Sequence, residues 1–280
     1  MEKGYGEDIP YSRVVESTDP SYKKSIWDAA IGLQAVDGLE VSSYLRSLSE
    51  ENISGKKSYD EIKSDLSREY GERSSSKKEA DMVAVRIAEI LEIGGFSMLP
   101  VTLVSIHRRL FEGVFEDGMA GCFRTYNITK KENILFGDTV RYGDWQSVSD
   151  SLKYLIDGEK GYRYSSPMTE EDIAHLSEFT KDIWQVHPFG EGNTRTVAVF
   201  IELYMRSMGF AIDNEPFADN SLFFRNALVR ASYSAPESGI YPNMNFLIHF
   251  YKNVFLGEKY ILDNFDLFIS NKTDSNYEAD

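Results

Sequence analysis

Apolar side chains recur every three to four residues through most of this 280-residue chain, which is the spacing of an amphipathic helix. The clearest case covers residues 77–93, where Met82, Val85 and Ile90 share a face and Gly94 follows as a stop signal. The same spacing predicts helices over residues 22–36, 41–52, 59–70, 101–114, 145–156, 169–186, 193–208, 222–232 and 243–255. The chain is therefore predicted to be all-α.

One segment departs from this pattern. Residues 124–144 are rich in β-branched, aromatic and turn residues, which predicts a short β-hairpin with its tip near residues 130–133. The polar ends, 1–20 and 269–280, are expected to be flexible. A serine run that begins at Ser74 suggests a boundary between an N-terminal helical region, residues 21–75, and a main bundle, residues 76–268.

Charge and cysteine content limit the classes of partner. The 30 basic and 45 acidic side chains give a net charge of −15, which opposes non-specific nucleic-acid binding. A local cluster of donors can still hold phosphates inside an acidic protein. The single cysteine, Cys122, excludes an intrachain disulfide framework and fits a reducing compartment. With no apolar signal-peptide core and no stretch fit to span a bilayer, we expect a cytoplasmic protein without membrane or nucleic-acid partners.

The segment His187-Pro-Phe-Gly-Glu-Gly-Asn-Thr-Arg195 connects two predicted helices and carries most of the chemistry. Its glycines let the backbone approach a ligand, and the free N–H groups at the start of the second helix form an anion site. Arg195 adds a fork of donors suited to phosphate, and Asn193 adds a side-chain amide. These residues predict a phosphate cradle.

Two further side chains in the segment have a chemical use. Glu191 fits beside phosphate if Mg²⁺ lies between them, and His187 titrates near neutral pH. A phosphate cradle, a metal carboxylate and a general base therefore occur within nine residues. An ordinary turn between helices is the alternative that these residues alone leave open.

The segment closely resembles the signature of the Fic (filamentation induced by cAMP) family, His-x-Phe-x-Asp/Glu-Gly-Asn-Gly-Arg-x-x-Arg. Six positions agree at the same spacing: His187, Phe189, Glu191, Gly192, Asn193 and Arg195. Similarity continues upstream through residues 106–111, 119–121 and 124–125 and downstream through 222–231, so it covers roughly residues 77–255. The resemblance implies an all-α Fic fold with a small β-hairpin flap, and it makes residues 76–268 the Fic domain.

The resemblance also implies an activity: transfer of AMP from ATP to a Tyr, Thr or Ser hydroxyl of a target protein, self-modification included. His187 would be the catalytic base, and Glu191 would hold Mg²⁺ on the phosphates. Phe189 would anchor the loop in the core. The implied ATP-binding residues are Gly192, Asn193, Thr194, Arg195, Phe224 and Ser232, the last two lining the adenine pocket. Core packing is the alternative for Phe224, and a homo-oligomer stays open.

Two regions outside the signature gain an implied role. The flap, about residues 129–137, would align the target as an added strand, clamped by Ile134 or Phe136. Plain packing explains such apolar residues equally well. In the N-terminal region, Ser47, Glu51 and Asn52 fit the family's inhibitory pattern, Ser/Thr-x-x-x-Glu-Gly/Asn, in which a helix places its Glu in the nucleotide site. A solvated helix face is the alternative.

Two positions depart from the family pattern. Thr194 replaces a glycine, and Ala198 replaces the second arginine, which typically meets the γ-phosphate. The related Doc toxins lack that arginine too and transfer phosphate from an inverted nucleotide. A Doc-like phosphotransferase is therefore an alternative, as is a degenerate Fic fold that only binds nucleotide or a partner. Without the second arginine, Glu51 would pair with Arg195, stay partly solvated or remain outside the site.

Overall fold

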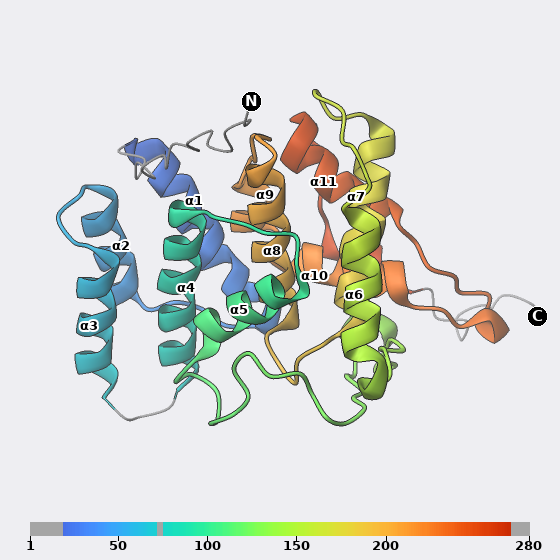
Figure 1. Ribbon diagram of the computed structural model, residues 1–280, viewed down its shortest axis with the longest axis horizontal. Coiled ribbons are helices and arrows are strands. Elements are labelled where there is room, and N and C mark those ends of the chain that lie inside the picture. The colour runs from blue at the N-terminus through green and yellow to red at the C-terminus, as the bar shows by residue number, and fades with distance from the viewer. Residues whose placement is uncertain (1–18, 72–74, 270–280) are drawn as a thin grey trace, which may run out of the picture.

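The computed structural model describes residues 19–71 and 75–269, and Figure 1 shows a bundle of helices in this part of the chain. The elements are α1 (Pro20–Gly32), η1 (Leu33–Asp37), α2 (Ser43–Ile53), α3 (Tyr59–Tyr70), α4 (Ser76–Ile93), α5 (Pro100–Phe111), η2 (Asn133–Leu135), η3 (Trp145–Ser147), α6 (Val148–Glu159), α7 (Glu170–Val186), α8 (Asn193–Ser207), α9 (Glu215–Asp219), α10 (Ser221–Ser232), η4 (Pro236–Ser238), α11 (Asn245–Leu256) and η5 (Asn264–Leu267). Most of both predicted flexible ends, and the proposed boundary at Ser74, lie outside the described residues.

The all-α prediction is confirmed, and each of the predicted helices has a counterpart that begins and ends within a few residues. Local capping explains several of these limits. Ser58 and Glu61 form a reciprocal capping box at the start of α3, and Thr169 and Asp172 form another at the start of α7. The short helix α9 was not predicted, because five residues are too few to show a helical period.

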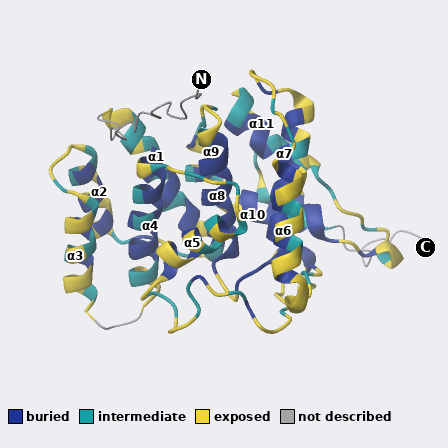
Figure 2. Ribbon diagram, in the orientation of Figure 1, coloured by how far each residue is buried: buried dark blue, intermediate teal, exposed yellow. Residues whose placement is uncertain are grey.

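Helix α8 runs through the centre of the molecule, and every residue from Asn193 to Met205 is buried (Figure 2). The two largest fully buried side chains, Trp27 and Trp184, come from α1 and α7. Ile26, Leu45 and Ile62 of the N-terminal region belong to the same hydrophobic core as the residues of α8. The signature segment therefore leads directly into a helix whose first thirteen residues are all buried.

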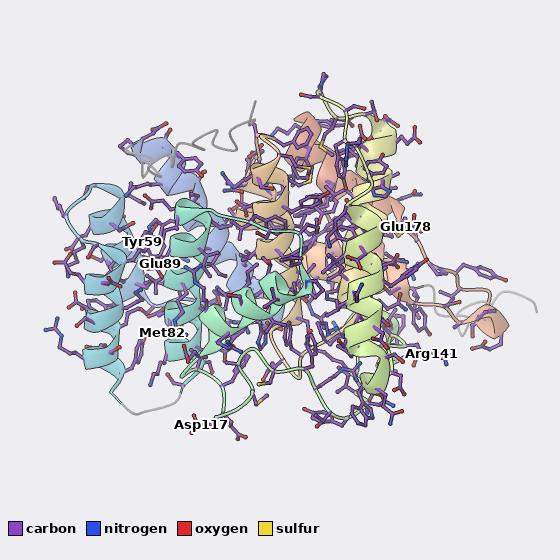
Figure 3. The ribbon with its side chains drawn as sticks, in the orientation of Figure 1. Tyr59, Met82, Glu89, Asp117, Arg141 and Glu178 are labelled. Atoms are coloured by element: carbon purple, nitrogen blue, oxygen red, sulfur yellow. The ribbon has the colours of Figure 1, made fainter. Side chains whose placement is uncertain are left out.

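Helix α3 of the N-terminal region is held against α4 by polar contacts. Tyr59 of α3 donates to Glu92 of α4 at 2.5 Å, and Lys63 of α3 pairs with Glu89 at 2.9 Å. Figure 3 labels Tyr59 and Glu89 near helices α3 and α4. None of the helices in the described ranges is long and apolar enough to cross a lipid bilayer.

The predicted hairpin over residues 124–144 needs a correction. Within the described residues, no β-ladder forms there; the segment is an irregular loop that contains the single 3₁₀ turn η2. Glu132 and Asp138 close the turn through a backbone bond of 2.8 Å, and Lys130 N donates to Thr139 Oγ1 at 3.1 Å. Side chains that point toward the bundle hold this loop in place, and its two halves do not pair as strands. We keep the name flap for residues 129–137.

Candidate active site

The signature segment turns sharply between α7 and α8. His187 ends α7 in the left-handed conformation, with φ 51°, and Gly192 precedes α8 with φ 73°. A Cβ atom at Gly192 would lie 2.4 Å from Cε2 of Phe111, so only glycine fits there. The ring of Phe189 is buried, as expected of a core anchor.

His107 of α5 supports the turn through hydrogen bonds and ring stacking. Its Nε2 donates to the carbonyl oxygen of Glu191 at 3.0 Å, and its Nδ1 accepts from the Gly121 amide at 2.8 Å. The imidazole stacks on Phe189 with ring centroids 3.7 Å apart. Burial lowers the pKa of His107 to about 4, so the ring is neutral at pH 7, as the two bonds require.

Arg124 connects the base of the flap to the same turn. Its Nε donates to the His187 carbonyl at 2.7 Å, and its Nη1 donates to the Tyr126 carbonyl at 2.7 Å. Its own amide donates to the Pro188 carbonyl at 2.9 Å. The sequence placed Arg124 only at the start of a hairpin; its role as a clamp on the loop carbonyls depends on contacts 62–63 residues apart.

The turn and the flap enclose a cavity of about 290 Å³. Residues 190–194 of the turn line it, together with Ile128 and the first two residues of the flap, Thr129 and Lys130. The titratable and charged side chains on its wall are Asp37, Tyr126, Lys130, His187, Glu191 and Arg225. Larger hollows of about 620 and 690 Å³ elsewhere on the molecule contain none of the six signature residues.

His187 lies on the wall of this cavity as a neutral base. Its Nδ1 donates to the Trp184 carbonyl at 3.2 Å, which leaves the lone pair on Nε2. Its ring centroid lies 4.2 Å from that of Tyr142. Burial, together with the positive charges of Lys130 and Arg124, lowers the pKa of His187 to about 3. The predicted base is thus in the correct protonation state to accept a proton.

The start of α8 offers backbone donors to the cavity. Within the described residues, no side chain caps this helix N-terminus. Both ends of the Asn193 amide are used by the loop, since Oδ1 accepts from Phe189 N at 3.0 Å and Nδ2 donates to Phe189 O at 2.9 Å. Thr194 Oγ1 accepts from Trp184 Nε1 at 2.9 Å. The backbone N–H groups of this first turn are therefore the donors best suited to an anion.

Arg195 does not take the predicted position. Its guanidinium is fully buried away from the cavity, where Nε lies 2.9 Å from Asp37 Oδ2 and Nη2 lies 2.7 Å from Glu79 Oε1. Nη1 donates to Gln34 Oε1 at 3.2 Å, and the plane lies over Phe111. The expectation that Arg195 faces phosphate is corrected: two carboxylates of η1 and α4 attract it into the core. Ala198, at the family's second arginine position, is also buried.

Glu191 is exposed and lines the cavity, as its predicted metal role requires. Partial desolvation raises the pKa of its carboxyl, and the negative charges of Glu79 and Asp37 raise it further. A carboxylate in such a field is stabilised by a cation. The described residues contain no cluster of three or more metal-ligating side chains, so a metal ion here would need oxygen ligands from a substrate.

The predicted adenine-pocket residues need a correction. Phe224 is fully buried among Phe217, Phe250 and Tyr251, with ring centroids 5.0–6.1 Å away, so it belongs to the aromatic core. Ser232 is buried at the end of α10. Neither residue is among those that line the cavity.

The predicted inhibitory residues also lie elsewhere. Glu51 pairs with Lys57 at 3.3 Å, at the end of α2, and Ser47 is exposed to solvent. Asn52 accepts from Trp27 Nε1 at 2.9 Å and donates to Lys57 O at 2.8 Å, which ties α1 to the turn that follows α2. Of the three positions open to Glu51, the structure shows the one outside the site. The carboxylates that Arg195 contacts come from Asp37 and Glu79 instead.

The two residues predicted to clamp a target, Ile134 and Phe136, have different surroundings. Ile134 is buried, and its carbonyl accepts from the Ile269 amide at 3.1 Å, so packing explains it and the clamp assignment is corrected. Phe136 is 54% exposed, with φ 52°. Its ring centroid lies 5.9 Å from that of Phe268. Of the two, Phe136 is therefore the side chain available to a partner.

Sequence reasoning missed three charged residues on the cavity wall: Asp37, Lys130 and Arg225. Arg225 Nη2 lies 2.9 Å from Glu132 Oε1 and 2.8 Å from Oε2, which joins α10 to the flap. A basic residue at the tip of a predicted loop, such as Lys130, was the one available signal.

Part of the chain, including this site, is similar to known proteins. Residues 98–205, which include the clamp, the flap and the signature segment, match the model of the Fic/DOC family. The resemblance to the Fic family is confirmed for this segment. A solved Fic family protein from Desulfovibrio desulfuricans G20 superposes with a TM-score of 0.51 at 14% sequence identity. That likeness shows the fold alone.

The solved Fic protein is larger than this chain. The superposition covers 85% of this chain and 66% of the other, so this chain spans just under two thirds of its length. No curated protein sequence matches the chain. The Fic match supports a Fic-type transferase in general.

Proposed function

We propose that this chain transfers AMP from ATP to a hydroxyl group of a protein side chain, itself included. The observation that carries the proposal is the position of His187. Its imidazole is buried and neutral, with the lone pair on Nε2, and it lines the same cavity as the first residues of α8. The Fic match of residues 98–205 supports the same reaction class.

In the proposed reaction, the hydroxyl oxygen of the acceptor bonds to the α-phosphorus of ATP. The bond between that phosphorus and the oxygen bridging to the β-phosphate breaks, and pyrophosphate leaves. The hydroxyl proton moves to Nε2 of His187, which then carries the positive charge. The backbone N–H groups at the start of α8 bind the phosphate oxygens, whose negative charge also raises the pKa of His187 and strengthens it as a base.

Glu191 would hold Mg²⁺ together with phosphate oxygens of the substrate. Burial is the main cause of its raised pKa, and the negative charges of Glu79 and Asp37 add to it, so a bound divalent cation would stabilise the carboxylate. When bound, the ion supplies charge neutralisation to the phosphates. The carboxylate of Glu191 lines the cavity, and its backbone carbonyl is held by His107.

Transfer of phosphate instead of AMP is the second candidate, and Ala198 is the observation that favours it. The second arginine of the family pattern would fix the γ-phosphate, yet this position is a buried alanine. Phe224 and Ser232, the two residues predicted to line an adenine pocket, are not on the cavity wall either, so they do not hold the nucleoside part of ATP. An inverted nucleotide, with its γ-phosphorus at the acceptor, would use the same His187 base.

The test is self-modification followed by mass spectrometry of the intact chain. Parent protein is incubated with Mg²⁺ and ATP labelled at the α- or the γ-phosphorus. An added AMP carrying the α-label supports the proposal, and an added phosphate carrying the γ-label supports the second candidate. His187→Ala should abolish either product, whereas His249→Ala, which removes a ring stacked on Tyr260, should not. No transfer by the parent would instead favour a fold that only binds.

The partners of the proposal are ATP, Mg²⁺ and a protein with an acceptor Tyr, Thr or Ser. The proposal keeps the cytoplasmic setting expected from the sequence, where ATP is available. Inhibition by Glu51 is not part of the proposal, since that carboxylate lies with Lys57.

A further inference from the structure

Besides Mg²⁺, the signature offers the phosphates of a nucleotide a cationic side chain, and in this chain that arginine, Arg195, is unavailable. Arg195 has two carboxylates and an amide oxygen around its three nitrogen atoms. Breaking those contacts would leave Asp37 and Glu79 without their partner in a mostly buried site, which is strongly unfavourable. The cation must therefore come from another element.

Each of two other arginines near the cavity is also engaged. Arg225 contacts both carboxylate oxygens of Glu132, at 2.9 and 2.8 Å. Arg124 donates to the carbonyl groups of His187 and Tyr126. Both keep their charge, but their donor groups are committed to the flap and the loop.

Lys130 is different. It lines the cavity from the flap, its side chain is 50% exposed, and its contact with Asp37, at 3.8 Å, is beyond hydrogen-bond distance. The backbone at Lys130 is fixed by the bond from its amide to Thr139 Oγ1. Among the described residues on the cavity wall, it is the one cation whose side chain makes no hydrogen bond. An ammonium group on a flexible stem can follow a phosphate group without rearrangement of the loop.

The field of Lys130 reaches the base. Its charge is the largest of the charge effects that lower the pKa of His187, after burial. Lys130 and His187 therefore face the same small volume from the flap and from the end of α7. A phosphate in this cavity would be within reach of the Lys130 ammonium group and of the first residues of α8, which line the same volume.

We propose that Lys130 binds the phosphate groups of the substrate, in place of the arginine of the signature. The inference rests on the proposed function, because it assumes a nucleotide in this cavity. It makes the flap a part of the phosphate site, in addition to any role in docking a target. Asp37, the present neighbour of Lys130, is exchanged for a phosphate oxygen when substrate binds.

The experiment measures binding of ATP with Mg²⁺, and separately of inorganic pyrophosphate, to the full chain by titration calorimetry. Lys130→Ala should weaken both by about 10-fold to 100-fold, the worth of a hydrogen bond to a charged group. Lys130→Arg should restore most of the affinity. Lys131→Ala removes an exposed neighbour of the same type and net charge, and it should stay within about twofold of the parent. Because Lys130 is half exposed, the Lys130→Ala chain should melt at the parent temperature.

The outcomes separate this inference from the proposed function. If ATP binds to the parent and to Lys130→Ala equally, the role of Lys130 is overturned while the transferase survives. If pyrophosphate binds through Lys130 but ATP does not bind, the phosphate site stands and the AMP-transfer proposal fails. If the parent binds neither probe, both fail. Equal losses in Lys130→Ala and Lys131→Ala would also overturn the inference, since net charge alone would then explain them.

Discussion

His107 and Glu191, 84 residues apart in the sequence, are joined by a hydrogen bond of 3.0 Å from the imidazole Nε2 to the backbone carbonyl. The bond holds the backbone of Glu191, which carries the only carboxylate of the signature loop and lines the cavity. Since Nδ1 accepts from the Gly121 amide, the ring is fixed in a single neutral tautomer. The shape of the candidate site thus depends on a histidine that stays uncharged.

Acid should weaken the fold through His107. Its pKa is about 4 in the folded chain and about 6.5 in the unfolded chain, so the unfolded state binds more protons between these values. Stability is complete above about pH 6.5 and falls toward pH 4, by roughly 3 kcal/mol at most for this residue. Denaturant unfolding at pH 7, 6 and 5 should show a smaller decline in His107→Asn than in the parent. An identical decline would contradict the assignment.

Gly192→Ala should destabilise the chain by about 1–3 kcal/mol, as overpacking and backbone strain typically do. The added Cβ would lie 2.4 Å from Phe111, and the φ of 73° disfavours any L side chain. Gly38→Ala is the matched control, because Gly38 has φ 69° but nothing within 4 Å of the added atom. The difference between the two variants in urea unfolding measures the contact with Phe111. Equal losses would assign the whole effect to backbone strain.

Glu51→Ala should leave transferase activity unchanged at every ATP concentration. The carboxylate of Glu51 is 40% exposed and paired with Lys57, whose second partner, Asp65, remains. Alanine also preserves the helix. Self-modification rates of parent and variant across an ATP series provide the measurement. Strong activation of the variant would show that α2 reaches the cavity in another state of the protein.

Glu191→Gln should reduce the apparent affinity for Mg²⁺ at least as much as the loss of an outer-shell partner, roughly 10-fold or more. The substitution removes a charge that lines the cavity but leaves the backbone bond to His107 in place. Activity against Mg²⁺ concentration, with EDTA as the zero point, is the readout. Glu116→Gln removes an exposed carboxylate outside the cavity lining and should behave as the parent. Coincident curves for all three chains would remove Glu191 from the metal site.

The pH dependence of activity should reveal the low pKa of His187. For the free enzyme that pKa is about 3, so kcat/KM should show no loss from His187 protonation between pH 8 and pH 5. Bound phosphates raise the pKa, so the acid limb of kcat should lie at a higher pH than that of kcat/KM. Rates of transfer measured at limiting and at saturating ATP give the two profiles. A limb of kcat/KM near pH 6.5 that follows His187 would refute the buried neutral base.

Local patterns predicted the helices and the turn well, because their causes lie within a few residues. Helix α8 begins at Asn193 and ends at Ser207, close to the predicted 193–208, since Gly192 and the apolar period mark it directly. The direction of Arg195 was not predictable. A position in the first turn gives a side chain several possible neighbours, and the ones that attract it here, Asp37 and Glu79, come 158 and 116 residues earlier in the chain.

The flap was mispredicted for a related reason. Its β-branched and aromatic residues suggested paired strands, yet the stabilising contacts come from outside the segment. Glu132 turns inward to Arg225 of α10, and Ile134 is covered by the core while its carbonyl accepts from Ile269. A strand ladder needs two edges free to pair, and here tertiary contacts take precedence over β propensity.

The buried position of Arg195 has a consequence for how this chain can change over generations. Its guanidinium contacts Gln34 and Asp37 of η1 and Glu79 of α4, while Arg195 itself belongs to the signature loop and the start of α8. Deleting or exchanging the first helices would strand a buried charge, at about 3–5 kcal/mol. We therefore expect the signature and the residues that hold Arg195 to change together: a recombination that moved the loop alone would have to bring new carboxylates for this arginine.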